Sequence, residues 1–220
     1  MTRLLVVWML SALPLAALAL DDDPAAAFAA FESRLLAARH VQLQARVLAT
    51  GALPADLTGH LEAGPRNAMS LDFSGTLAGA PRTLSLQSDA WRAHLADATR
   101  QRDETTGGEQ NRALLLTLAR AGLLHNLARL ANLEGPERGA GGAARWVTVE
   151  NFHHPTYALG GPLEGLLAFG FDVMVDGRIA GPARLWLDPG TGLPKRREQT
   201  LQTPQGAVTV TEEYPEFVLE

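Results

Sequence analysis

The fold of this chain is decided by Gly181-Pro-Ala-Arg-Leu-Trp-Leu-Asp188-Pro-Gly-Thr-Gly-Leu-Pro194-Lys-Arg-Arg-Glu-Gln-Thr200. An apolar run before Asp188 and a polar run after Pro194 flank a turn that is rich in Gly and Pro. A second turn at Pro204-Gln-Gly206 leads into Val208-Thr-Val-Thr-Glu-Glu-Tyr214. Strands joined by turns this short predict an antiparallel meander.

Working outward from that meander, alternation of apolar and polar residues recurs along most of the chain. It predicts strands over residues 41–47, 57–63, 69–73, 84–86, 146–152 and 166–175. Asp176-Gly177 after the last of these is a hairpin turn signal. Strands that alternate in this way have one buried and one solvated face, as in an open antiparallel sheet. Residues 103–108 and 135–144 are predicted to be loops.

Two segments have helical periodicity instead. Residues 24–39 begin with Pro24 after an acidic run and place Phe28, Phe31 and Leu35 on one face. Residues 109–133 carry so many leucines that they cover more than half of a helical wheel, and Gly122 offers a break. A helix that is apolar on most sides is buried on most sides. It is either an ordinary core helix or a layer between the sheet and other helices.

The first residues predict export. Arg3 precedes an apolar run from Leu4 to Leu18, and Ala17 and Ala19 fit the small-residue rule of a cleavage site. We therefore expect a signal peptide over residues 1–19 and one domain over residues 20–220. A transmembrane anchor fits less well, because the run is short and contains a proline.

Composition narrows the class further. The chain has no cysteine, which excludes disulfides, a thiol nucleophile and a lipid-modified cysteine anchor. This favours a soluble periplasmic protein rather than a secreted disulfide scaffold. The 19 basic residues against 24 acidic ones argue against nucleic acid as a partner. The one basic cluster, Lys195-Arg196-Arg197, is interpreted as part of an edge or solvated strand.

Three motifs resemble the lipoprotein-carrier (LolA-like) superfamily of exported bacterial proteins. They are FGFDVMVDG (169–177), ARLWLDPGTGLPKRREQT (183–200) and VTVTEEYPEF (208–217), and the resemblance is strongest over residues 165–218. It implies an α+β fold, a curved and incompletely closed antiparallel sheet (a half-barrel) with an N-terminal helix. Helices would cover the concave face over an apolar cavity that takes up acyl chains. Residues 112–133 would be a central helical lid.

If such a cavity exists, the apolar residues of the sheet and of the lid should line it. The predicted ligand-binding residues are Leu71, Phe73, Leu84, Leu86, Leu116, Leu123, Leu127, Phe169, Phe171 and Trp186. The hypothesis requires a hollow between the leucine-rich helix and the strands. Side chains that filled this space completely would argue against it.

Enzyme signatures are missing from the sequence. There is no His-Glu-x-x-His, no Gly-x-Ser-x-Gly elbow and no phosphate-binding glycine pattern. His153 and His154 could share a metal ion in a metal-assisted hydrolysis, yet no third ligand is apparent, and a polar turn explains them equally well. We predict no catalytic site, no metal site and no cofactor.

The sequence therefore predicts a monomeric periplasmic protein that binds a lipid, a lipidated protein or another apolar ligand non-covalently, with transient membrane or envelope contacts. The alternative is a protein-interaction or sensor module of the envelope that uses the same fold without a ligand cavity.

Overall fold

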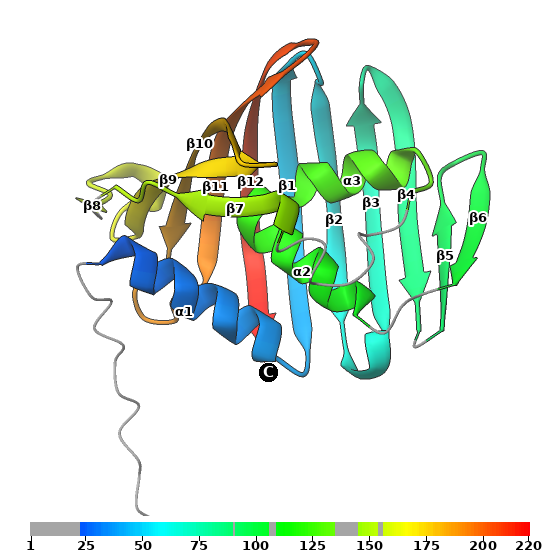
Figure 1. Ribbon diagram of the computed structural model, residues 1–220, viewed down its shortest axis with the longest axis horizontal. Coiled ribbons are helices and arrows are strands. Elements are labelled where there is room, and N and C mark those ends of the chain that lie inside the picture. Colours follow the sequence, from blue (N-terminus) through cyan, green and yellow to red (C-terminus); the bar gives the residue numbers. More distant parts are fainter. Residues whose placement is uncertain (1–22, 90, 106–108, 135–144, 154–155) are drawn as a thin grey trace, which may run out of the picture.

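The computed structural model describes residues 23–89, 91–105, 109–134, 145–153 and 156–220. Within these residues, twelve strands form one antiparallel sheet, and three α-helices lie on one side of it (Figure 1). The strands are Val41–Gly51 (β1), Ala55–Ala63 (β2), Met69–Leu77 (β3), Ala80–Ser88 (β4), Arg92–Ala96 (β5), Gln101–Thr105 (β6), Val147–Glu150 (β7), Thr156–Tyr157 (β8), Leu167–Val175 (β9), Arg178–Leu187 (β10), Pro194–Thr203 (β11) and Gly206–Leu219 (β12). Short 3₁₀ turns cover Pro65–Asn67 (η1) and Gly161–Leu163 (η2).

Helix α1, Pro24–Ala37, begins where the sequence predicts and ends two residues earlier than expected. The carboxylate of Asp23 accepts a hydrogen bond from the backbone N–H of Ala25 at 2.9 Å and so caps the helix. Pro24 follows at the first helical position, where no backbone donor is needed. The face that carries Phe28 and Phe31 is buried against the sheet, because both rings pack against aromatic residues of the strands.

The predicted strands are all present, and the hairpin turn after β9 has the expected geometry. Asp176 and Gly177 both have positive φ, 48° and 72°, as a two-residue turn of this kind requires. In the next turn the Asp188 carboxylate accepts hydrogen bonds from the N–H groups of Gly190 and Thr191, each at 2.9 Å. These local contacts fix the register of the meander from β9 to β12.

The loop predicted over residues 103–108 is wrong for its first half. Residues 103–105 belong to β6, which pairs with β5 as a hairpin at the edge of the sheet. The side chains of β6 are nearly all solvent-exposed. With no buried face, the strand has no apolar alternation from which it could be predicted.

The strand order is β6-β5-β4-β3-β2-β1-β12-β11-β10-β9-β7, with β8 also on the edge of β9. At the centre, β1 pairs with β12, so the sheet joins one half built from the beginning of the described chain to another built from its end. The sheet is strongly curved and its two edges, β6 and β7, are not paired with each other. The predicted α+β half-barrel is thereby confirmed.

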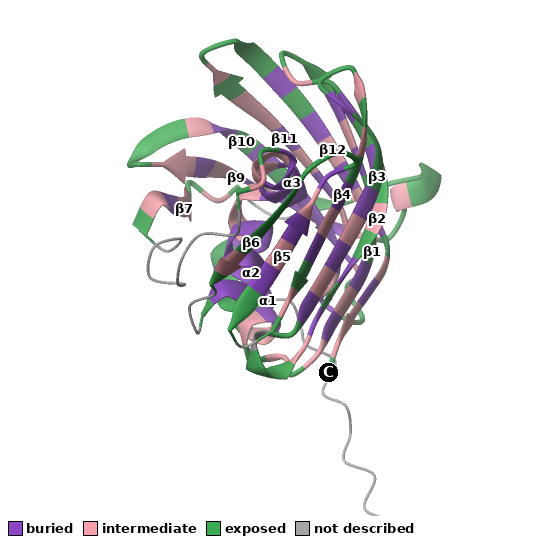
Figure 2. Ribbon diagram, turned by 90° about the vertical axis from the view of Figure 1, so that its right-hand side faces the viewer, coloured by how far each residue is buried: buried purple, intermediate pink, exposed green. Residues whose placement is uncertain are grey.

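The leucine-rich segment forms two helices that lie across the concave face. Helix α2, Gln110–Ala121, and helix α3, Leu123–Ala131, are separated by the predicted break at Gly122. Figure 2 shows buried and exposed residues alternating along the strands. The buried strand residues belong to one hydrophobic cluster with residues of the helices. The core therefore lies between the sheet and the three helices.

Three predictions fall outside the described residues. They are the signal peptide over residues 1–19, the loop at 135–144 and the placement of His154.

Candidate functional site

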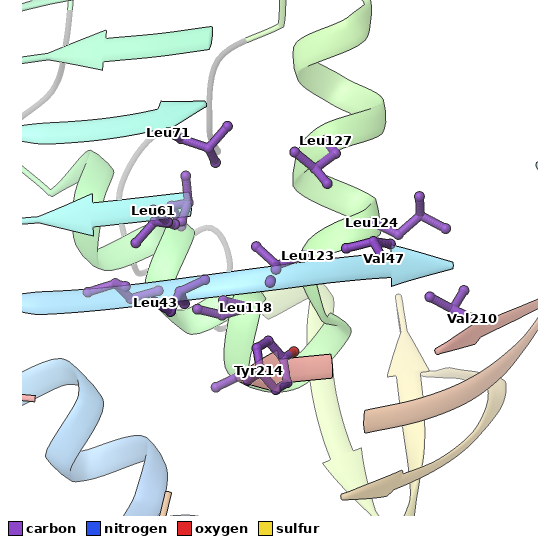
Figure 3. Packing of buried hydrophobic residues seen from close by; sticks show 14 of the residues in the cluster. Leu43, Val47, Leu61, Leu71, Leu118, Leu123, Leu124, Leu127, Val210 and Tyr214 are labelled. Carbon is purple, nitrogen blue, oxygen red and sulfur yellow. The ribbon is translucent and has the colours of Figure 1, made fainter. Parts of the chain in front are cut away.

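The interior between sheet and helices contains most of the predicted ligand-binding residues. Eight of them belong to one hydrophobic cluster, and each is at most 2 % exposed: Leu71, Phe73, Leu84, Leu86, Leu123, Leu127, Phe169 and Phe171. They come from β3, β4, β9 and α3, which the fold brings together although they are far apart in the sequence. Figure 3 shows the side chains of α3 meeting those of the strands in this layer.

Two of the predicted residues lie elsewhere. Leu116 packs with Ala113 and Leu36 in a small separate cluster, on a side of α2 that faces α1. Trp186 lies on the outer face of the sheet, since Leu185 and Leu187 on either side of it belong to the inner cluster. Its ring is flanked by the guanidinium groups of Arg184 and Arg196, at 5.6 and 5.9 Å from the ring centroid. The structure therefore places neither residue in the sheet–helix interior, and their ligand-binding role stays a prediction.

Where the structure describes the chain, the predicted hollow is closely packed, since the eight residues above are at most 2 % exposed. Beneath the C-terminal half of α3, Leu71, Leu86, Leu114 and Leu130 line a void of about 10 Å³, together with Asn126, Arg129 and Glu134. This is room for about one water molecule and not for an acyl chain. A ligand in this layer would need the helices to move.

One end of α3 is attached to the sheet by a buried polar junction, which we define as Gly122, Arg197, Glu212 and Tyr214. Arg197 of β11 donates hydrogen bonds to the carbonyl oxygens of Ala119 and Arg120 at the end of α2, at 2.9 and 2.7 Å. Its guanidinium therefore satisfies carbonyl groups that the end of a helix leaves without partners.

Glu212 of β12 serves the beginning of α3 in the same way. Its Oε1 accepts hydrogen bonds from the backbone N–H groups of Leu123 and Leu124, at 2.7 and 3.1 Å. Its Oε2 accepts a hydrogen bond from the hydroxyl group of Tyr214. A carboxylate at this place also complements the positive end of the helix dipole.

Only glycine fits between the two helices. Gly122 has φ of +82° and ψ of −177°, a conformation that is essentially restricted to glycine. A Cβ atom added there would lie 2.6 Å from Oε1 of Glu212. The junction thus ties the start of α3 and the end of α2 to the sheet at Gly122, through both backbone conformation and direct contact.

Burial governs the electrostatics of the junction. It raises the pKa of the Glu212 carboxyl and lowers the pKa of the Arg197 guanidinium, because each charge is removed from water. The opposite charge of the partner counteracts both shifts. The pKa of Tyr214 is raised by burial and by the charge of Glu212. The junction is therefore a pair of buried charges, each satisfied by hydrogen bonds.

The other end of α3 is held by contacts that solvent can reach, which we call the catch. Arg100 donates a hydrogen bond to the carbonyl oxygen of Ala131 at 2.8 Å, and Arg102 of β6 donates one to that of Leu133 at 3.3 Å. Half or more of each arginine side chain is exposed. Arg100 is itself bound to Asp97 at 2.7 Å. Helix α3 is thus fixed firmly at the end near Gly122 and loosely at its C-terminal end.

Sequence reasoning missed the junction. The interpretation of Lys195-Arg196-Arg197 as part of an edge or solvated strand is wrong for Arg197, which lies on an inner strand of the sheet and is buried against α2. The signal was the position of Arg197 opposite Glu212 in the hairpin register, on the face where β12 carries Val208 and Val210.

The histidine hypothesis gains no support. Across the described parts of the chain, no three His, Asp or Glu side chains are grouped so that they could hold a metal ion. The backbone N–H of His153 donates a hydrogen bond to the carbonyl oxygen of Gly170, and the His153 ring lies against that glycine.

In the described parts of the chain, no helix is both long and apolar enough to span a bilayer.

Comparison with known proteins gives structural matches without sequence relatives. No family model matches the chain, and no curated protein has a similar sequence. A search of solved structures finds the MucA/MucB complex of Pseudomonas aeruginosa at 15% identity and a TM-score of 0.39. This match covers 87% of the present chain, which spans only 56% of the matched one.

Two further matches cover both partners almost completely. LprF from Mycobacterium bovis has 10% identity and a TM-score of 0.40, with 89% of this chain and 94% of that chain covered. A LolA superfamily protein from Nitrosomonas europaea has 6% identity and a TM-score of 0.34, with 89% and 93% covered. Proteins of the LolA superfamily, which the sequence motifs resemble, are thus among the structural matches.

Proposed function

We propose that the protein carries a lipid or another apolar ligand, bound non-covalently between the sheet and the α2–α3 layer. One observation carries the proposal: α3 covers an apolar sheet surface, held by a buried junction at one end and by an exposed catch at the other. Such an arrangement favours a lid that turns about Gly122 and opens at its C-terminal end.

Opening at that end would separate α3 from β3 and β4, where the void of about 10 Å³ already lies. It would break the two exposed hydrogen bonds of the catch and leave the junction intact. Opening would expose apolar surface of the sheet and of α3 to water. The ligand would offset this free-energy cost by burying its methylene groups there, at about 0.8 kcal/mol for each one. The sheet itself would not have to change.

We place this carrier in the periplasm, as a monomer. The support comes from the apolar run and cleavage signal at residues 1–19, followed by a single domain over residues 20–220, and from the absence of cysteine. Lipids or lipidated proteins are the partners that fit an acyl-binding interior, with transient contact to a membrane or envelope protein on loading and release.

Uptake of Nile red tests the lid directly. The double variant Arg100→Gln/Arg102→Gln removes the two hydrogen bonds of the catch. If these exposed contacts stabilise the closed lid by on the order of 1 kcal/mol, their loss should raise the population of the open lid about fivefold. We expect faster dye uptake. Arg92→Gln on the neighbouring strand β5 is the matched control. Equal uptake by both would contradict the lid.

Two measurements test the ligand itself. Native mass spectrometry of protein purified without detergent should detect a bound lipid. Leu123→Asp and Leu127→Asp should abolish dye uptake while the far-ultraviolet circular dichroism of the sheet is retained. Loss of that signal as well would identify α3 as an ordinary core helix.

A second function is favoured by the filled interior. With room for about one water molecule between the layers, the same fold could serve as a protein-interaction or sensor module of the envelope. In that case the catch variant takes up no dye and the purified protein carries no lipid, whereas an envelope protein copurifies with it.

A further inference from the structure

The outer face of the sheet carries a groove that the proposed carrier function does not use. Its volume is about 550 Å³, which is within the range of small-ligand sites. The floor comes from the outer faces of β1, β11 and β12, and includes Arg46, Arg196 and Glu213. The wall is the segment before β9, with Pro162, Leu163 and Leu166; Lys195, Tyr214 and Pro215 complete the lining.

The groove lies where two neighbouring strands are irregular. Pairing of β10 with β11 shifts between Trp186 and Leu187, so that Lys195 has no partner across the ladder. Pairing of β1 with β12 shifts between Gln44 and Arg46, at the level of Pro215. Bulges bend a strand locally and redirect side chains, and they are over-represented beside functional sites.

The charges of the groove are unequally satisfied. Arg196 forms ion pairs with Glu198 at 2.6 Å and Glu213 at 3.2 Å, and Arg46 pairs with Asp56 at 3.2 Å. Lys195 is half-buried, and it makes no hydrogen bond or ion pair with any residue that the structure describes. The hydrogen bond from the N–H of Thr191 is the main cause that lowers the pKa of the Asp188 carboxyl, and the Lys195 charge is the smallest of the causes given by its surroundings.

The wall opposite these charges is apolar. Leu163 and Leu166 are half-buried in the groove, and the same segment bears Leu159, which is 95 % exposed. A half-buried lysine that makes no hydrogen bond or ion pair with the described residues, next to an apolar wall, matches a ligand with an anionic head and a hydrocarbon tail.

We propose that the outer groove binds a single-chain amphipathic anion, an acyl chain that ends in a carboxylate. The tail lies along Leu163 and Leu166, and the carboxylate accepts hydrogen bonds from the ammonium group of Lys195. The charged side chains of this site lie on the face of the sheet opposite to the α2–α3 layer, and Tyr214 is the one lining residue that also belongs to the junction.

Lys195 is the one lysine of the chain, which allows a local test. Reductive methylation with ¹³C-formaldehyde keeps its positive charge and gives one lysine NMR signal, distinct from that of the terminal amine. Titration with dodecanoate should shift this signal. Dodecyltrimethylammonium, with the same tail and a positive head, and acetate, with the head alone, should not.

Variants locate the tail and the head by calorimetric titration with dodecanoate. Leu163→Asp and Lys195→Glu should each weaken binding roughly tenfold or more, because a buried apolar contact or a charge-assisted hydrogen bond is lost. Leu159→Asp, on the same segment but outside the groove lining, should bind as the natural protein does.

Several results would overturn the proposal. They are an unchanged Lys195 signal at saturating dodecanoate, an equal shift with the cationic detergent, or equal affinity of the Leu163→Asp and Leu159→Asp variants. Dodecanoate that binds without moving the Lys195 signal occupies the sheet–helix interior instead, so this test and that of the carrier function can fail separately. A shift produced by an apolar acidic peptide, and not by dodecanoate, would identify a peptide site.

Discussion

Neighbouring residues on β11 and β12 have opposite environments on the two faces of the sheet. On the outer face Arg196 lies opposite Glu213, and on the inner face Arg197 lies opposite Glu212. The outer pair is an ion pair of 3.2 Å with both side chains partly in solvent. The inner residues are only 2 % and 1 % exposed, and they direct hydrogen bonds to the helices.

The difference shows that the same pair of residue types has two different roles. An exposed ion pair contributes little to stability, because water and salt screen it. A buried charge must keep its partners, since removing one leaves the other desolvated and unpaired. The inner pair therefore determines where the helices attach to the sheet, whereas removal of the outer pair should change the stability of the fold little.

The strongest test replaces the two arginines in turn. Arg197→Met should lower the free energy of unfolding by about 3–5 kcal/mol, because Glu212 would stay buried without its counter-charge. Arg196→Met should cost less than about 1 kcal/mol. Guanidinium chloride denaturation measures both. Equal losses would remove the distinction between the faces, whereas partial recovery in Arg197→Met/Glu212→Gln would confirm the coupling.

The contact of Gly122 with the inner pair is tested by Gly122→Ala. It should cost about 3 kcal/mol, since the backbone conformation there is restricted to glycine and the new Cβ would meet Glu212. Gly177 also has a positive φ, but a Cβ added there would have no atom within 4 Å. Gly177→Ala should therefore lower the free energy of unfolding by only about 1–2 kcal/mol. Denaturation midpoints that fall equally would show that Glu212 plays no part.

The pH dependence of stability tests a further buried titratable group of the helix layer, the imidazole of His125. Burial, and secondarily the charge of Arg129, lowers the pKa of His125 to about 4. Its pKa in the unfolded chain is about 6.5, so stability is complete above that pH and is lost as the pH falls toward 4. Between pH 7.5 and 5 the free energy of unfolding should fall by roughly 1–2 kcal/mol from this residue.

Urea midpoints at the two pH values measure this loss. His125→Gln should flatten the dependence. A slope that survives in His125→Gln would assign the loss to other groups.

The smallest effect is expected for an outer pair alone. Asp56→Asn removes the partner of Arg46, whose side chain is half exposed, and should lower the denaturation midpoint only slightly. The cost should vanish at about 1 M salt, where screening is nearly complete. A loss of several kcal/mol that persists in salt would mean that the outer face also contains stabilising charges.

Much of the fold was predictable because its signals are local. Asp23 and Pro24 define the start of α1, Asp176-Gly177 defines a hairpin, and Gly122 separates α2 from α3. Alternation then assigns the side chains of the long strands to the two faces of the sheet. Because successive side chains point to opposite faces, the apolar positions can all be buried in only one of the two possible assignments.

The rest depends on contacts between distant segments. Trp186 sits in an apolar triplet, Leu185-Trp186-Leu187, where alternation gives no face, and only the register with β9 and β11 resolves it. The burial of Arg197 requires knowing that α2 ends above it. The strand β6 has no buried face and so leaves no pattern in the sequence.

The pairing of β1 with β12 affects how the molecule can assemble. Val41 of β1 pairs with Leu219 of β12, so the two strands that meet in the middle of the sheet are far apart in the sequence. We call this β1–β12 pairing the seam. Contacts of such long range close slowly, because a large loop must be ordered before they form. Until that seam closes, each half exposes a strand edge with unpaired N–H and C=O groups, a hazard for aggregation.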